Sequence, residues 1–183
     1  MHDTSLWVFG YGSLIWNPGF PVAERHIATL PGHSRSFCMR SIHHRGTSDR
    51  PGLVLALDPT QGSACHGIGF RVRAGAEEET VDYLRERELV SAAYLEAEVA
   101  IRLEDGREVD AMTFVIDPHH EQYVHGLPLE DQARIIAAAH GGKGPNAEYL
   151  YNTTAHLAEL GIADAELEWL AARVREIEAE GAS

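Results

Sequence analysis

An apolar, β-prone run near the N-terminus ends abruptly at two glycines, and this limits what the chain can fold into. Trp7-Val8-Phe9 favours a buried strand, Gly10-Tyr11-Gly12-Ser13 interrupts it, and Leu14-Ile15-Trp16 is apolar again. A strand that ends in this way leaves successive backbone N–H groups unpaired by the sheet, and glycines let a ligand approach the backbone closely. Clustered N–H groups form a nest for an anion. The residues alone leave two interpretations open: a ligand-binding loop, or a plain turn between two strands.

The bulk properties predict one acidic domain spanning residues 1–183. The chain is 44% hydrophobic, which is enough for one well-buried core, and no repeat or linker divides it. Its net charge of -13 argues against a nucleic-acid or anionic-membrane partner. No apolar run approaches the ~20 residues needed to span a bilayer, and the N-terminus lacks the features of a secretory signal. We expect a cytoplasmic protein, a monomer or weak homodimer, in which Cys38 and Cys65 stay reduced.

The first two-thirds of the chain is rich in strand patterns. We expect a loop-rich section with short strand-like pieces from Ala23 to Arg50, and a turn at Gly62-Ser63 between two strands. Residues 94–103 and 109–116 form a further pair of expected strands, joined by a hairpin turn at 104–107.

The helical patterns lie mostly in the last third. A helix begins at Glu77, a second follows Pro128, a third starts with Asn146 as its N-cap and stops before Gly161, and a fourth carries Leu167 to Ile177. Strands followed by helices favour the α+β class over alternating βαβ units.

One carboxylate falls on the apolar side of the helix that begins at Glu77. Val81, Leu84 and Glu88 share one face by their i, i+3, i+7 spacing. Burial of a carboxylate is costly and raises its pKa toward the range useful for proton transfer. The alternative is that the helix ends earlier and leaves Glu88 in solvent.

Several segments together resemble the ChaC-type γ-glutamylcyclotransferases, in the same order and over nearly the whole chain. The signature WVFGYGSL followed by a Trp occupies residues 7–16, and residues 35–47 are similar to RxFcxxSxxxRGT. Residues 84–94 look like LxxRExxxxxY, and residues 144–150 look like GxNxEYL. The chain departs from the family at Ala92-Ala93, where a glycine is common, and this could alter the shape of the pocket.

The resemblance implies a fold, a reaction and a set of site residues. It implies a small mixed, barrel-like β-sheet with surrounding helices, and an enzyme that closes the γ-glutamyl group of glutathione into 5-oxoproline and releases cysteinylglycine. Glu88 would be the catalytic base and acid, and no metal or cofactor is implied. The substrate-binding residues carried over are Val8, Phe9, Gly10, Tyr11, Gly12, Ser13 and Tyr149.

Alternatives remain for substrate and for role. The chain could act on another γ-glutamyl amine or amino acid, or be a non-catalytic binding protein, against which the presence of Glu88 argues. Eleven histidines, including His43-His44 and His119-His120, invite a metal site, but no Cys or HExxH pattern accompanies them. Cys38 is a possible nucleophile, but no positioned His or Asn partner for it can be argued from the sequence. For Arg45, a structural salt bridge is favoured over a contact with a substrate carboxylate.

Overall fold

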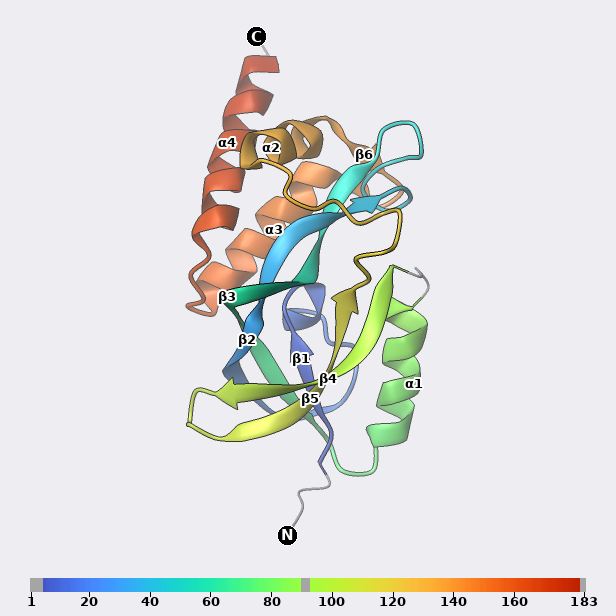
Figure 1. Cartoon of the computed structure of the whole chain (residues 1–183), viewed down its shortest axis with the longest axis vertical. Coiled ribbons are helices and arrows are strands. Elements are labelled where there is room, and N and C mark those ends of the chain that lie inside the picture. The colour runs from blue at the N-terminus through green and yellow to red at the C-terminus, as the bar shows by residue number, and fades with distance from the viewer. Residues whose placement is uncertain (1–4, 90–92, 182–183) are drawn as a thin grey trace. The chain divides into compact units, whose positions relative to one another are not determined.

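Five strands close into a barrel in the computed structural model, which describes residues 5–89 and 93–181 (Figure 1). Neighbours around the barrel follow the order β1-β3-β2-β4-β5, and β5 returns to β1. The strands of the barrel are β1 (Trp7–Gly10), β2 (Val22–Ser41), β3 (Gly52–Val72), β4 (Tyr94–Leu103) and β5 (Glu108–Ile116).

Strand β1 makes the sheet a mixed one. Val8 lies opposite Phe70 of β3 in an antiparallel pair and opposite Met112 of β5 in a parallel pair. All four residues of β1 are buried, so both faces of this strand are covered, which suits a continuous apolar run. The expected α+β fold with a small mixed, barrel-like sheet is confirmed, with four α-helices in the described residues.

The two long strands correct the expected loops. β2 runs through most of the section predicted as loop-rich, and β3 continues across the turn predicted at Gly62-Ser63. Gly62, predicted as part of a turn, instead lies within β3 with φ 86°, and Gly32 lies within β2 with φ 77°; this backbone region suits glycine. Turn residues therefore mark irregular points of long strands here.

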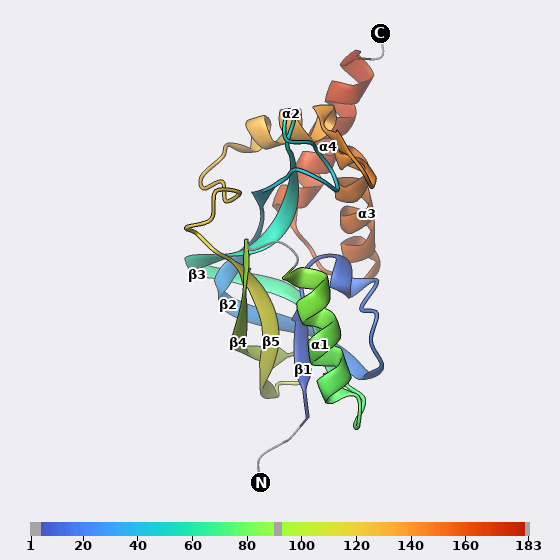
Figure 2. The same ribbon diagram turned by 90° about the vertical axis from the view of Figure 1, so that its right-hand side faces the viewer.

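The hairpin and the first helix match the sequence expectations closely. β4 pairs with β5 from Tyr94–Ile116 to Arg102–Glu108, and Gly106 (φ 94°) lies in the turn between them. Helix α1 spans Glu77–Glu88, with three glutamates in its first turn, where the helix dipole favours negative charge. Figure 2 shows α1 beside the barrel strands.

The chain divides into two compact units. One consists of residues 1–35 and 56–120, and the other of residues 36–55 and 121–183, so β2 and β3 each contribute to both. The prediction of a single domain over 1–183 stays a prediction.

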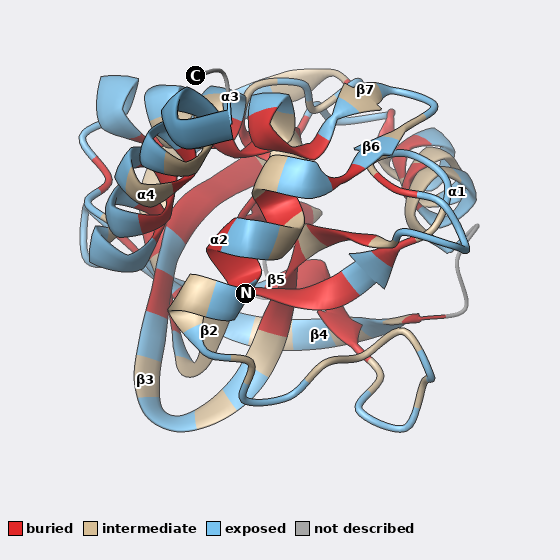
Figure 3. Cartoon of the chain, turned by 90° about the horizontal axis from the view of Figure 1, so that it is seen from above, coloured by how far each residue is buried: buried red, intermediate tan, exposed pale blue. Residues whose placement is uncertain are grey.

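The second unit holds the remaining helices, α2 (Leu129–Ala138), α3 (Asn146–Glu159) and α4 (Ala165–Gly181), and a small sheet of β6 (His140–Gly141) and β7 (Gly144–Pro145). Each helix buries one side and exposes the other, as Figure 3 shows. Leu167, Leu170 and Val174 form the buried stripe of α4 that the sequence predicted. Gly161, with φ 75°, follows α3 as expected for a glycine that ends a helix.

Asn146 does not cap α3. It is the first residue of the helix, Pro145 precedes it as the N-cap, and no side-chain cap is present. The fully buried Asn146 amide instead binds the backbone of Leu53: Nδ2 donates to the Leu53 carbonyl at 2.8 Å, and the Leu53 N–H donates to Oδ1 at 2.8 Å. Buried backbone groups need partners more than a helix end does, because solvent can satisfy the latter.

Replacing Asn146 with Ala is expected to lower the free energy of unfolding by about 2–3 kcal/mol, because two buried backbone groups lose a partner. Urea denaturation measures the change. Asn152→Ala, at an exposed position of the same helix, is the matched control and is expected to have little effect. Equal effects of the two variants would contradict the role given to Asn146.

Candidate active site

The glycine segment, residues 10–19, begins at the end of β1 and includes a short 3-10 helix, η1 (Ser13–Ile15). Val8 and Phe9 are completely buried, and the Phe9 carbonyl accepts a hydrogen bond from Thr113 Oγ1 at 3.0 Å. Their side chains are therefore buried on the two opposite faces of β1. Of the residues carried over by the resemblance, these two support the segment from beneath.

Backbone N–H groups are clustered just after Gly10. Ile15 N–H donates to the Gly12 carbonyl at 2.9 Å, which closes η1. The N–H groups at the start of such a turn have no partner within it. Within residues 5–89 and 93–181, no hydrogen bond is donated by the N–H groups of Gly12, Ser13 or Leu14, although Gly12 and Leu14 are buried residues. Buried N–H groups nearly always have a partner, so this cluster suits an anionic ligand or ordered water.

Arg35 holds the segment from the barrel side. Its side chain is buried, and Nε donates to the Tyr11 carbonyl at 2.7 Å. A second guanidinium nitrogen donates to the His66 carbonyl of β3. Arg35 belongs to a matched segment of the sequence, but its contact with Tyr11 could not be predicted, because it joins positions 24 residues apart.

Glu88 is the last residue of α1, and its side chain is only 18% exposed. Leu84, one turn earlier, is completely buried, and Val81 is half-buried. The helix therefore continues far enough to carry the carboxylate inward, as the i, i+3, i+7 spacing predicted. The burial argues against the alternative of a solvated residue beyond the helix end. Val90 and Ala92, from the same matched segment, lie outside the described residues.

Burial raises the pKa of Glu88, because removal from water penalises the charged carboxylate. The Arg87 guanidinium, with Nε 3.5 Å from Glu88 Oε1, lowers the pKa and offsets part of this effect. The C-terminal end of a helix carries partial negative charge, which also disfavours an ionised carboxylate. A raised pKa brings the group nearer to the range in which it can both take and return a proton.

Arg87 connects the end of α1 to the glycine segment. Its Nη2 donates to Ser13 Oγ at 3.0 Å, and its Nη1 donates to the Asn17 carbonyl at 2.7 Å. The Arg87 side chain therefore contacts both the Glu88 carboxylate and the segment that carries the N–H cluster. The contact with Ser13 could not be predicted from local patterns, because it joins positions 74 residues apart.

Tyr83 and Gly19 show how closely α1 approaches the turn after η1. A Cβ added to Gly19 would collide with the Tyr83 hydroxyl, and Gly19 has φ 76°. Only a glycine meets both conditions without displacement. The Tyr83 hydroxyl also accepts a hydrogen bond from Arg87 Nη1 at 3.1 Å.

Tyr149 belongs to the second unit, on α3. Its hydroxyl accepts a hydrogen bond from the Leu55 N–H at 3.2 Å, and its ring packs edge-on against Phe37. These contacts give Tyr149 a supporting role within that unit, and a contact with substrate stays a prediction. Arg45 pairs with Glu148 at 3.7 Å and donates to the Pro145 carbonyl at 3.0 Å, the structural role that was favoured.

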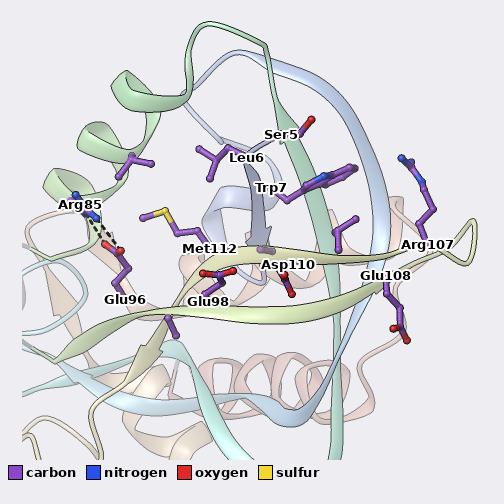
Figure 4. Close-up of a pocket in the computed structure, with 14 residues that line it drawn as sticks. Ser5, Leu6, Trp7, Arg85, Glu96, Glu98, Arg107, Glu108, Asp110 and Met112 are labelled. Atoms are coloured by element: carbon purple, nitrogen blue, oxygen red, sulfur yellow. Dashed lines mark hydrogen bonds and ion pairs between the residues drawn. The ribbon is translucent and has the colours of Figure 1, made fainter. Parts of the chain in front are cut away.

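The first unit also has a groove of about 740 Å³ between α1 and the outer side of β4 and β5. Figure 4 shows Glu96, Glu98 and Asp110 along it, with Glu96 bound by Arg85 at 2.7 Å. Neither Glu88 nor residues 8–13 line this groove. It is a different surface from the one that carries the candidate site.

Other candidates gain no support from the described residues. There, no group of three or more His, Cys, Asp and Glu side chains is placed to hold a metal ion. Cys38 and Cys65 are both buried. In the same ranges, no helix has the length and apolar character needed to cross a membrane.

The raised pKa of Glu88 predicts a pH-dependent cost to stability. A pKa that is higher in the folded than in the unfolded state contributes stability that is fully present below the unfolded-state pKa and is lost as pH rises through the folded-state pKa. We therefore expect Glu88→Gln to unfold at a higher temperature than the wild type at neutral pH. The difference should disappear in acid, where Glu88 is protonated in both states. Thermal unfolding across this pH range checks the prediction, and a gap independent of pH would contradict it.

Comparison with known proteins identifies the family. A family model described as ChaC-like protein matches residues 6–177. A glutathione-specific γ-glutamylcyclotransferase of Escherichia coli (strain K12) is 38% identical over 175 residues, which cover 96% of this chain and 75% of that protein. γ-Glutamylcyclotransferase 2-3 of Arabidopsis thaliana is 35% identical, with 96% of this chain and 92% of that protein covered.

A solved structure shares the fold. The crystal structure of a γ-glutamyl cyclotransferase specific to glutathione from yeast superposes with a TM-score of 0.84 at 24% identity, covering 95% of this chain and 97% of that one. At this identity the likeness concerns the fold alone. The family match and the identities to its members lead to one conclusion: this chain belongs to the ChaC-like family.

Proposed function

We propose that this protein is a glutathione-specific γ-glutamylcyclotransferase, with Glu88 as its catalytic residue. Three relatives that share 32–38% identity over most of the chain carry γ-glutamylcyclotransferase names, and two of these names specify glutathione. The observation that carries the proposal is a mostly buried carboxylate at the end of α1, which Arg87 joins to a segment whose backbone N–H groups at Gly12, Ser13 and Leu14 find no partner among the described residues.

The proposed reaction is an intramolecular aminolysis. The α-amine of the γ-glutamyl group attacks the γ-carbonyl carbon, and a new C–N bond closes a five-membered ring. The original amide C–N bond then breaks, so that 5-oxoproline and cysteinylglycine are formed. Because both reacting groups belong to one molecule, the main tasks of the protein are to fold the substrate into a reactive geometry and to move protons.

Glu88 would move those protons. The α-ammonium group is not a nucleophile until it loses a proton, which the ionised carboxylate accepts. The protonated carboxyl then donates this proton to the leaving nitrogen of cysteinylglycine, and the ring nitrogen gives its remaining excess proton to the regenerated carboxylate. A single group that both accepts and donates works best when its pKa lies near the working pH, and burial raises the pKa of Glu88 in that direction.

The N–H cluster would bind the negative charge of the substrate. The groups of Gly12, Ser13 and Leu14 suit the α-carboxylate of the γ-glutamyl moiety or the oxyanion that develops on the γ-carbonyl oxygen. Val8 and Phe9 would contribute by holding this backbone in place from the core. Tyr149 remains a proposed binding residue, with the residue's hydroxyl as the contacting group.

A substrate panel tests the function. Purified protein is incubated with glutathione, γ-glutamyl dipeptides and a γ-glutamylamine, and 5-oxoproline is detected by chromatography. We expect 5-oxoproline and cysteinylglycine from glutathione alone. Product only from the other compounds would keep the reaction but overturn the specificity, and no product from any compound would favour a binding protein of the same fold.

Glu88→Gln tests the proposed catalyst. The amide keeps the size of the side chain but cannot accept the proton, so kcat with glutathione is expected to fall by about 10²–10⁴-fold or more. Glu86→Gln, an exposed position on the same helix, is the matched control and is expected to keep wild-type activity. Retained activity in Glu88→Gln would overturn the mechanism, provided that circular dichroism shows both variants folded.

A further inference from the structure

We infer that Arg87 is a positioning residue that holds the glycine segment and the Glu88 carboxylate in one fixed arrangement. Glu88 extends from the end of a helix, while the N–H cluster lies on a separate part of the chain that follows β1. A side chain that contacts both parts is therefore needed to fix the distance between the Glu88 carboxylate and the N–H cluster. The Arg87 side chain, on α1, contacts Ser13 at the start of η1 and Asn17 after its end.

The contacts of Arg87 are numerous and directional. Nη1 donates to the carbonyls of Asn17 and Pro18 at 2.7 and 3.3 Å, and Nη2 donates to Ser13 Oγ at 3.0 Å. The Arg87 side chain is 20% exposed; its contacts with Pro18 and Ser13 are partly buried, and its contact with Asn17 is exposed. Partly buried contacts are screened less by solvent than the surface pairs that contribute little. Hydrogen bonds from a charged donor are about twice as strong as neutral ones.

The geometry calls for an arginine in particular. A guanidinium presents five N–H groups in a rigid planar fork, and here two of its nitrogens contact different residues of the segment while Nε faces Glu88. A lysine has the same charge but a single nitrogen, so it cannot reproduce all of these contacts at once. This difference separates the effect of the charge from the effect of the shape.

Arg87 is also the charged group that contacts Glu88 among the described residues. Residues 7–19, which form β1 and the glycine segment, carry no charged side chain, and the neighbouring Arg85 and Glu86 on α1 are exposed. Removal of the Arg87 charge should therefore let burial raise the pKa of Glu88 further.

This inference rests on the proposed function for its kinetic consequences, but its structural part is tested independently of turnover. The variants are Arg87→Gln, which removes both the positive charge and the planar guanidinium group, and Arg87→Lys, which keeps the charge but removes the guanidinium group. Arg85→Gln is the matched control: it removes the same charge two residues earlier, from an exposed pair with Glu96. Hydrogen exchange of the amides in residues 10–19 and the pH profile of kcat/KM for glutathione are measured for each.

We expect amide exchange in residues 10–19 to be about tenfold faster in both Arg87 variants and unchanged in Arg85→Gln, because the segment opens locally when its contacts with α1 are lost. We expect kcat/KM to fall by about 10–100-fold in Arg87→Gln, since small misplacements of reacting groups are costly. The acidic limb of its profile should move to higher pH. Arg87→Lys should keep the wild-type limb while its KM rises.

Three results would overturn the inference: wild-type exchange and kinetics in Arg87→Gln, equal effects in Arg85→Gln, or full recovery of slow exchange in Arg87→Lys. If Arg87→Gln does not fold, exchange in Arg87→Lys decides alone. Failure of the proposed function would be recognised separately, because the wild-type protein would then turn over no γ-glutamyl compound. The comparison of amide exchange would still decide the role of Arg87.

Discussion

The candidate site depends on the exclusion of water from one carboxylate at the end of a helix. An ionised carboxylate is most stable when hydrated, yet α1 ends with the Glu88 side chain mostly buried and with its pKa raised as a consequence. Arg87 moderates this cost by its charge and fixes the helix end to the glycine segment by its hydrogen bonds. The burial of the carboxylate, its ionisation and its position are thus set by two adjacent residues, Glu88 and Arg87.

The barrel makes this arrangement possible. Because β1 has neighbours on both sides, Val8 and Phe9 are locked in the core, and the backbone that follows them leaves the sheet at a fixed point. Arg35 then binds the Tyr11 carbonyl and so fixes the backbone that follows. The N–H groups of Gly12, Ser13 and Leu14 are thereby held in place, while they donate no hydrogen bond within the described part of the chain. A site built on backbone groups needs such support, since no side chain of its own defines it.

Local patterns predicted much of the fold and the carboxylate. The span of α1, the hairpin of β4 and β5, and the inward direction of Glu88 follow from periodicity and turn residues, which act over a few positions. The unbroken course of β2 and β3 could not be predicted, because Gly32 and Gly62 resemble turn signals unless the neighbouring strands are known. The roles of Asn146, Arg35 and Arg87 were missed for the same reason: each contacts residues far away in the sequence. The barrel itself came from the resemblance to a family.

The most direct test of the site asks whether the γ-glutamyl group binds at the N–H cluster. Backbone amide resonances of isotope-labelled Glu88→Gln protein, in which turnover is blocked, would be followed by NMR as glutathione is added. We expect saturable shifts at Gly12, Ser13 and Leu14. Unchanged resonances there, together with saturable shifts along the groove at Glu98 and Asp110, would contradict the placement of the substrate and move the site to that groove, which Val81 of α1 also lines.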